Sequence, residues 1–219
     1  MTLTTTKPDR HSLGKSFNLP NQLTSLRLAL SVVLFGLITT EHYIGSFVLF
    51  LIAVGTDWLD GYYARKFNQI TTLGRILDPF ADKVIVCGTF IFIVVAPGML
   101  AEPRGLRAWM VVVIVGRELL VTALRSFLEE RGSDFSANMS GKLKMVLQCV
   151  AAAASLVFLD CRGPRNPVLP NEFLPVPGWI YWTTIISIWS AVILTVYSGA
   201  IYVWIAYRLL RQKTDISDA

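Results

Sequence analysis

Apolar residues run in long stretches along this chain, and short polar segments or Pro and Gly residues separate them. A helix that crosses the roughly 30 Å hydrocarbon core of a bilayer needs about 20 mostly apolar residues. Six stretches approach or exceed this length: residues 23–38, 43–64, 75–96, 106–128, 143–159 and 179–210. The last is longer than one crossing, which predicts a tilted helix, an extension into the cytosol or an interfacial start. The pattern therefore predicts six transmembrane helices.

Helix-breaking residues fall between several of these stretches, at Pro97-Gly98, at Gly132-Ser133 and throughout the proline-rich segment 163–178. We expect residues 21–211 to form one six-helix transmembrane domain. Residues 1–20 would be a polar N-terminal segment, and residues 212–219 would be a polar tail.

The composition excludes most other classes of protein. The chain has 219 residues, of which 53% are hydrophobic and 16% charged, and its mean hydropathy is +0.54. Soluble domains carry roughly 25% charged residues, so too few are present here to cover a water-facing surface. With 3 Cys and 15 Gly, a disulfide scaffold and a collagen are excluded as well. The expected fold class is an all-α integral membrane protein.

The distribution of basic residues predicts the orientation of the chain. Six spans place both termini on one side, and 16 of the 20 Lys and Arg residues lie at or nearer that side. The four at the other side are Arg104, Arg107, Arg162 and Arg165. Because Lys and Arg accumulate in cytoplasmic loops, both termini are assigned to the cytoplasm. The net charge of +5 therefore marks a membrane side, and we expect no nucleic-acid partner.

Two acidic motifs stand where acids should be rare. The second stretch ends in DWLDGYYAR, residues 57–65, and the third begins with GRILDPFAD, residues 74–82. In each motif, acids and small residues share one helix face by their spacing: Asp57, Asp60, Gly61 and Ala64 in the first, and Gly74, Asp78 and Asp82 in the second. Since only a short connection separates the motifs, we expect both helix ends at the same cytoplasmic interface.

Four carboxylates brought together would repel one another, and two divalent cations would balance their charge. Ligand sets made only of oxygen select hard ions, here Mg²⁺ or Mn²⁺. Two such ions close together form the usual clamp for phosphoryl transfer. Alternatively, the acids pair with neighbouring basic residues at a wet interface: Arg65, Lys66, Arg75 and Lys83. Four acids on two matching faces, interleaved with small residues, favour the metal site.

The two motifs together resemble the signature of the CDP-alcohol phosphatidyltransferase family. Every position of that signature is filled: Asp57, Asp60, Gly61, Ala64, Arg65, Gly74, Asp78 and Asp82. The resemblance implies a six-helix membrane fold, four Asp residues that hold two divalent metals, and Asp82 as the general base. It also implies that the site for CDP-diacylglycerol includes Asp60, Gly61, Ala64, Arg65 and Gly74, and that the protein is a homodimer.

Basic residues further along the chain suggest which alcohol is the acceptor. Arg117 and Arg125 stand eight positions apart on one face of the fourth stretch, and Lys142 and Lys144 open the fifth. Arginines inside a membrane helix need an anion, and a phosphate on the acceptor would supply one. Alternatively, Arg125, Arg131 and the two lysines attract anionic headgroups or fix the topology, and Glu118 or a nearby Asp neutralises Arg117.

These segments, together with PNQLTSLR at residues 20–27, resemble the glycerol-3-phosphate-using branch of the family, the phosphatidylglycerophosphate synthases. The likeness covers roughly residues 18–148. Asn21 and Thr24, with Arg27, are candidates for contact with the nucleotide or the phosphates. Pro20 and Asn21 equally fit a helix start with Asn21 as its cap, and for Asn21 this structural interpretation is preferred.

The expected activity is transfer of the phosphatidyl group from CDP-diacylglycerol to the primary hydroxyl of sn-glycerol 3-phosphate, with release of CMP. Arg117, Arg125 and either Lys142 or Lys144 would bind the acceptor phosphate. The expected location is a bacterial inner membrane, among membrane lipids and with the active site facing the cytoplasm. An organellar membrane is the alternative. Other acceptors remain open, namely phosphatidylglycerol, inositol phosphate and serine, and a cation-coupled transporter is the alternative class.

Overall fold

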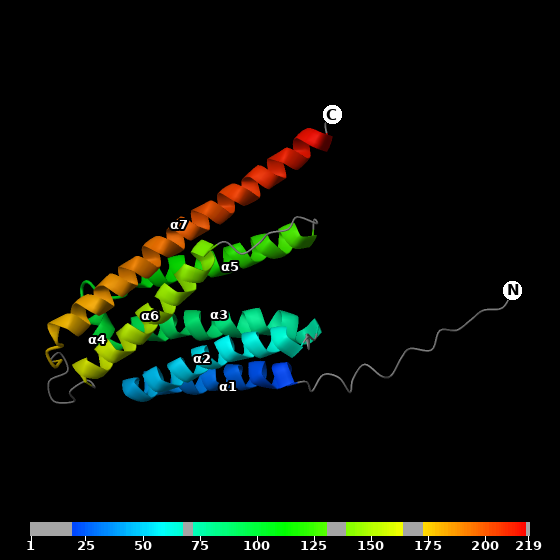
Figure 1. Ribbon diagram of the computed structural model, residues 1–219. Coiled ribbons are helices and arrows are strands. Elements are labelled where there is room, and N and C mark those ends of the chain that lie inside the picture. Colours follow the sequence, from blue (N-terminus) through cyan, green and yellow to red (C-terminus); the bar gives the residue numbers. More distant parts are fainter. Residues whose placement is uncertain (1–18, 68–71, 131–138, 164–172, 218–219) are drawn as a thin grey trace.

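The computed structural model describes residues 19–67, 72–130, 139–163 and 173–217, and every regular element in them is a helix. The helices are α1 (Leu19–Thr39), α2 (Tyr43–Phe67), α3 (Thr72–Val95), α4 (Pro97–Leu100), α5 (Ala108–Glu130), α6 (Met139–Arg162) and α7 (Gly178–Ser217) (Figure 1). Six of them coincide with the six predicted stretches. The short helix α4 was not predicted, because Pro97 and Gly98 were taken as a break. Proline at the first position of a helix is favourable, since its missing N–H would have no partner there.

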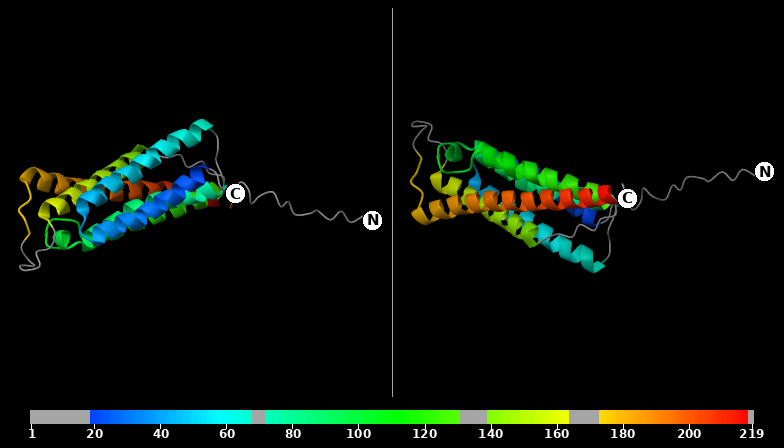
Figure 2. Two further views of the ribbon diagram at one scale, coloured as in Figure 1. Left: turned by 90° about the horizontal axis from the view of Figure 1, so that it is seen from below. Right: turned by 90° about the horizontal axis from the view of Figure 1, so that it is seen from above.

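The long helices form one bundle, and their axes run roughly along the long axis of the bundle. Helix α1 packs on α2 and α3, α2 packs on α6, and α7 packs on α5 and α6. The start of α1, the end of α2, the start of α3, the end of α5 and the end of α7 lie at the same end of the bundle (Figures 1 and 2). We call this the motif end, since the two acidic motifs lie there. The turn between α1 and α2 and the helix α4 lie at the opposite end.

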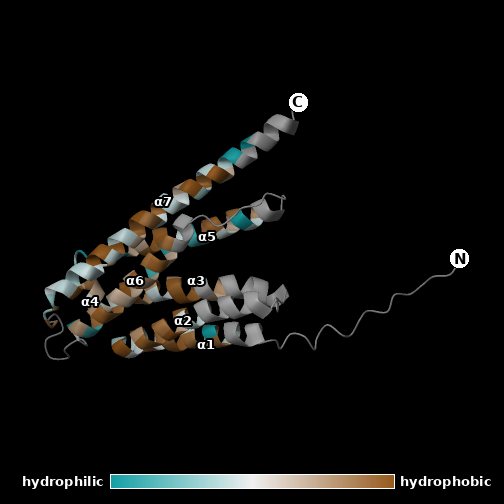
Figure 3. Ribbon diagram, viewed as in Figure 1, coloured by the Kyte–Doolittle hydropathy of each residue, from teal (hydrophilic) through white to brown (hydrophobic). Residues whose placement is uncertain are grey.

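Within the described residues, two helical segments are long and apolar enough to cross a membrane, Leu143–Arg162 in α6 and Gly178–Arg208 in α7. Shorter apolar segments lie in three other helices, at Ser25–Thr39, Tyr43–Thr56 and Lys83–Val95. In α5, three charged residues interrupt the apolar run: Arg117, Glu118 and Arg125. Figure 3 shows apolar residues along every long helix, with hydrophilic positions on α1, α5 and α7 toward the motif end. Helix α7 has 40 residues, which corresponds to about 60 Å and confirms that it exceeds a single crossing.

The surface of the bundle is apolar, whereas small polar side chains are buried within it. Val32 and Val112 are each 70% exposed and Trp179 is 73% exposed. Buried Ser and Thr hydroxyls donate to carbonyl oxygens one turn earlier, for example Thr89 to Ile85 (2.7 Å) and Ser155 to Ala151 (2.7 Å). A soluble protein rarely exposes apolar patches of this extent. The arrangement is typical of helices surrounded by lipid, where polar groups find their partners inside the bundle.

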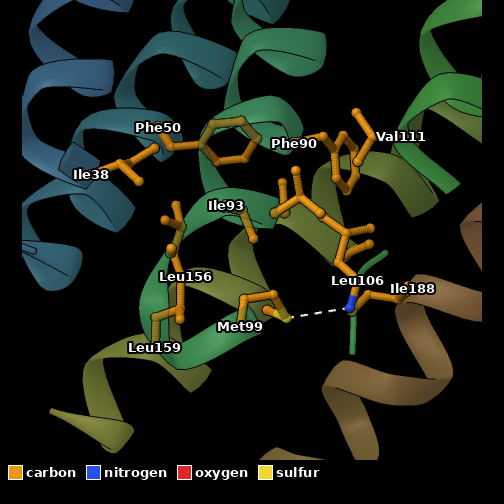
Figure 4. Packing of buried hydrophobic residues seen from close by; sticks show 14 of the residues in the cluster. Ile38, Phe50, Phe90, Ile93, Met99, Leu106, Val111, Leu156, Leu159 and Ile188 are labelled. Carbon is orange, nitrogen blue, oxygen red and sulfur yellow. Dashed lines mark hydrogen bonds between the residues drawn. The ribbon is translucent and has the colours of Figure 1, made fainter. Parts of the chain in front are cut away.

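The apolar core lies between α1, α2, α3, α5 and α6 and reaches α7 (Figure 4). Phe50, Phe90 and Ile93 are fully buried at its centre. Close to the end opposite the motifs, the Leu106 N–H donates to the sulfur of Met99, which fastens the segment after α4 to the bundle (Figure 4).

An ion pair links the helices at the end of the bundle opposite the motifs. Arg162 Nη2 lies 3.4 Å from Glu102 Oε2, and Arg162 also donates to the carbonyl oxygen of Gly98. Tyr181 donates to Glu102 Oε1 at 3.2 Å, and the Arg162 guanidinium lies 5.2 Å from the ring centroid of Phe158. This cluster, which we call the outer clamp, joins α4, α6 and α7.

Candidate active site

The two acidic motifs occupy helix ends that share one end of the bundle. The backbone is helical through Asp57, Asp60, Gly61, Ala64 and Arg65 at the end of α2, and through Gly74, Asp78 and Asp82 at the start of α3. The predicted helical spacing of both motifs is therefore confirmed for the backbone. Since α2 and α3 contact each other and both helix ends lie at the motif end, the four Asp residues stand on neighbouring elements (Figures 1 and 2).

The side chains of these motif residues lie outside the described part of the structure. Among the side chains that are described, no group of three or more His, Cys, Asp or Glu residues is arranged to hold a metal. The chemistry of the donor set fits Mg²⁺ or Mn²⁺, because four carboxylates on two adjoining helix ends supply only oxygen ligands.

The first two turns of α1 carry two of the residues predicted to contact the nucleotide. Helix α1 begins at Leu19, so Asn21 and Thr24 lie within the helix. The interpretation of Asn21 as the cap residue is wrong, since the helix starts two residues before it. Further along α1, Arg27 is 3% exposed, and it therefore lies inside the bundle with its charge.

Arg117 on α5 is the best-defined basic residue of the candidate site. Its side chain is only 9% exposed. Its Nη1 lies 3.4 Å from Glu118 Oε1, its Nη2 donates to the hydroxyl of Ser198, and its guanidinium carbon lies 5.4 Å from the ring centroid of Tyr202. Its Nε is buried and has no hydrogen-bond partner in the described ranges. Arg117 is thus fixed on three sides, and one edge of its guanidinium has no such partner.

Glu118 connects three helices through hydrogen bonds and ion pairs. Its Oε1 accepts from the ammonium group of Lys144 on α6 and, at 3.5 Å, from Nε2 of Gln148. Gln148 Nε2 also donates to Thr195 Oγ1 on α7 at 3.2 Å. We call the residues of this cluster the central network; they are Arg117, Glu118, Lys144, Gln148, Thr195, Ser198 and Tyr202.

The four residues predicted to bind the acceptor phosphate differ in their surroundings. Lys144 is 4% exposed and paired with Glu118. Arg125 lies on α5, about 12 Å along the axis from Arg117, and its Nε is buried without a hydrogen-bond partner among the described residues. Lys142 lies at the start of α6, and its side chain is outside the described set. The structure thus brings Arg117 and Lys144 together around one carboxylate.

Comparison with known proteins adds direct evidence on the family. A family model described as CDP-alcohol phosphatidyltransferase matches residues 17–197. The chain belongs to this family. The match extends well beyond residue 148, where the likeness was expected to end, and includes most of the apolar part of α7.

Named relatives cover most of the chain. A CDP-diacylglycerol–glycerol-3-phosphate 3-phosphatidyltransferase of Bacillus subtilis is 38% identical over 84% of this chain and 92% of its own length. An Arabidopsis thaliana protein with the same name, numbered 2, is 33% identical over 82% of this chain and 79% of its own length. The enzyme of that name from Escherichia coli K12 is 36% identical over 63% of this chain and 75% of its own length.

The chain is accordingly a phosphatidyltransferase of phospholipid biosynthesis, and the transporter alternative is wrong. Within this CDP-alcohol phosphatidyltransferase, five members of the central network were not predicted as site residues: Glu118, Gln148, Thr195, Ser198 and Tyr202. Glu118 was considered only as a neutralising neighbour. For the three residues on α7, the sequence did contain a signal. Thr195, Ser198 and Tyr202 stand at i, i+3 and i+7 and therefore mark one polar face on an apolar helix.

Proposed function

We propose that the chain transfers the phosphatidyl group of CDP-diacylglycerol to the primary hydroxyl of sn-glycerol 3-phosphate. The products are phosphatidylglycerol phosphate and CMP. The observation that carries the proposal is the similarity to the Bacillus subtilis enzyme of that name, which extends over 92% of the relative's length at 38% identity. The buried basic residues of α5 agree with an acceptor that bears a phosphate.

The acceptor phosphate binds at the basic residues of α5 and α6. Arg117 and Arg125 each have a buried Nε without a hydrogen-bond partner in the described ranges, and an arginine left in this state favours an anion. The Nε and Nη groups of a guanidinium form a fork that matches two phosphate oxygens. Lys142, close to the start of α6, is the candidate third ligand of the phosphate.

The donor binds at the motif end of α2 and α3. Gly61, Ala64 and Gly74 have small side chains, which let a bulky diphosphate and nucleotide approach the helices, and Arg65 stabilises negative charge on the leaving CMP. Asp57, Asp60, Asp78 and Asp82 would hold two divalent cations, Mg²⁺ or Mn²⁺. When bound, such ions would neutralise the negative charges of the phosphates.

Asp82 is the general base of the proposed reaction. It accepts the proton of the primary hydroxyl, and the hydroxyl oxygen then attacks the phosphorus that carries the diacylglycerol group. As the new P–O bond forms in line, the bond between this phosphorus and the oxygen of CMP breaks, and CMP leaves with the bonding electrons.

The proposed topology has six transmembrane helices within residues 21–211 and both termini in the cytoplasm. The start of α1 and the end of α7 lie at the same end of the bundle, which agrees with this topology (Figure 1). We further propose a homodimer in a bacterial inner membrane, with the active site at its cytoplasmic face.

The deciding experiment measures CMP release from CDP-diacylglycerol by the purified protein with each acceptor in turn. We expect release with glycerol 3-phosphate and little with serine, inositol phosphate or phosphatidylglycerol. Activity with one of the other acceptors alone would refute the proposed acceptor.

Arg117→Ala should raise the KM for glycerol 3-phosphate by about 30-fold, as expected for the loss of a buried charge-assisted bond, and should leave the KM for CDP-diacylglycerol within about twofold. An equal effect on both substrates would refute the role of Arg117 in binding the acceptor.

A further inference from the structure

We propose that Glu118 and Lys144 position Arg117 for the acceptor, and that Lys144 acts through Glu118 and does not itself bind the acceptor phosphate. The inference rests on the proposed function, since it assigns roles within the site for glycerol 3-phosphate. It divides the basic residues of the site into phosphate ligands and positioning residues.

The first argument concerns the partner of Lys144. Its side chain is 6% exposed, that of Glu118 is 14% exposed, and the two are ion-paired. The ammonium group has three N–H donors, and one of them is given to Glu118. An anion bound by the other two would lie beside the Glu118 carboxylate in a poorly exposed position, where the two negative charges repel each other. We therefore assign Lys144 to Glu118 and not to the acceptor phosphate.

The second argument concerns how Arg117 is held. Glu118 contacts Nη1, Ser198 contacts Nη2, and the guanidinium carbon lies over the ring of Tyr202. These contacts come from α5 itself and from α7, and they hold the guanidinium in position. The Nε edge is the part without a hydrogen-bond partner among the described residues. A guanidinium fixed in this way keeps its orientation when an anion binds along that edge.

The third argument concerns the shared carboxylate. The same oxygen, Oε1 of Glu118, accepts from both Arg117 and Lys144. With Lys144 in place, the charge of Glu118 is divided between two cations, and Arg117 retains attraction for a phosphate. Without Lys144, the full carboxylate charge would act on Arg117 and compete with the acceptor. Gln148 holds the same oxygen and reaches Thr195 on α7, which keeps the carboxylate in position.

A double-mutant cycle between Lys144→Met and Glu118→Gln tests the inference, with full-length protein in mixed micelles. The measured quantity is the KM for glycerol 3-phosphate at saturating CDP-diacylglycerol. A residue that acts only through Glu118 has no further effect once Glu118 is replaced. We therefore expect Lys144→Met to raise this KM by about tenfold in the original background and by less than about twofold in the Glu118→Gln background. We also expect Glu118→Gln alone to raise this KM, because Arg117 loses its orientation.

Two results of these Lys144 and Glu118 variants would overturn the inference. A tenfold effect of Lys144→Met in both backgrounds would identify Lys144 as a direct phosphate ligand. A lower KM in Glu118→Gln would show that Glu118 only opposes the acceptor electrostatically.

The outer clamp provides a matched control, since it contains a second largely buried ion pair far from the motif end. Arg162→Met should lower the melting temperature of the protein and leave the KM values for both substrates within about twofold. A selective rise in the KM for glycerol 3-phosphate in this variant would show that the measurement reports general destabilisation, and the inference would fail.

The Arg117→Ala variant separates failure of the inference from failure of the proposed function. If Arg117→Ala leaves the KM for glycerol 3-phosphate unchanged, the proposed acceptor site itself fails. If Arg117→Ala raises it while the cycle is additive, only the positioning roles fail.

Discussion

Gly199 on α7 offers a way to move Arg117 without changing any charge or hydrogen-bonding group. A methyl group added at Gly199 would lie 3.0 Å from Cγ of Arg117. Carbon atoms in contact prefer about 3.5–4.0 Å, so Gly199→Ala should displace the stem of Arg117 or the backbone of α7 by about 0.5–1 Å. The guanidinium cannot follow freely, because Ser198, Glu118 and Tyr202 hold it.

The expected kinetic effect follows from that displacement. Binding groups must be held within about 0.5 Å of their productive geometry, and a misplacement of about 1 Å can reduce activity by about 100-fold. For Gly199→Ala we expect kcat/KM for glycerol 3-phosphate to fall by about tenfold, mainly through KM. The KM for CDP-diacylglycerol should stay within about twofold of its original value.

Gly116→Ala is the matched control, since Gly116 immediately precedes Arg117 on α5. A methyl group at Gly116 would meet no heavy atom within 4 Å. The same alanine substitution should therefore leave both KM values unchanged. Both variants are assayed by CMP release over a range of glycerol 3-phosphate concentrations. If Gly199→Ala behaves like Gly116→Ala, or if it weakens only CDP-diacylglycerol, the assignment of Arg117 to the acceptor site is refuted.

Two further predictions concern the base and the core. Asp82→Asn should reduce CMP release by at least about 100-fold while CDP-diacylglycerol binding, measured directly, changes little; near-normal turnover would exclude Asp82 as the base. Gly88→Ala would place a methyl group 2.2 Å from Cζ of Phe35, so overpacking between α1 and α3 should destabilise the protein by about 1–3 kcal/mol. Its melting temperature should drop relative to Gly36→Ala, where the added methyl would meet nothing within 4 Å, and equal melting temperatures would refute the packing argument.

Hydrophobic pattern alone predicted the positions of the six long helices, because apolar runs in this chain are long and their breaks are marked by Pro, Gly and polar residues. The start of α2 at Tyr43 was predicted to the residue. Other helix ends shifted by up to seven residues, as at the end of α7, since polar residues can continue a helix into water. The short helix α4 escaped prediction because its proline was read as a break and not as a first helical residue.

Local spacing was sufficient to predict the acidic motifs, whose chemistry depends on residues a few positions apart. The central network could not be predicted in the same way. Its members lie on α5, α6 and α7, and the hydrogen bond between Arg117 and Ser198 spans 81 residues. Only the packing of the three helices brings them together. The spacing of Lys142 and Lys144 showed that one of them should point away from the other, but the structure was needed to show that Lys144 meets Glu118.

The charge of the central network bears on the choice of acceptor. Two cations and one carboxylate leave one net positive charge, and all three side chains are largely buried. An uncompensated charge in a low-dielectric interior is unfavourable, and a phosphate beside Arg117 would compensate it. A neutral or zwitterionic acceptor such as serine brings no net negative charge to the site. Under the proposed function, the network would therefore favour acceptors that carry a phosphate, independently of any contact with their hydroxyl groups. It would do so through Glu118 and Lys144, which set the net charge around Arg117.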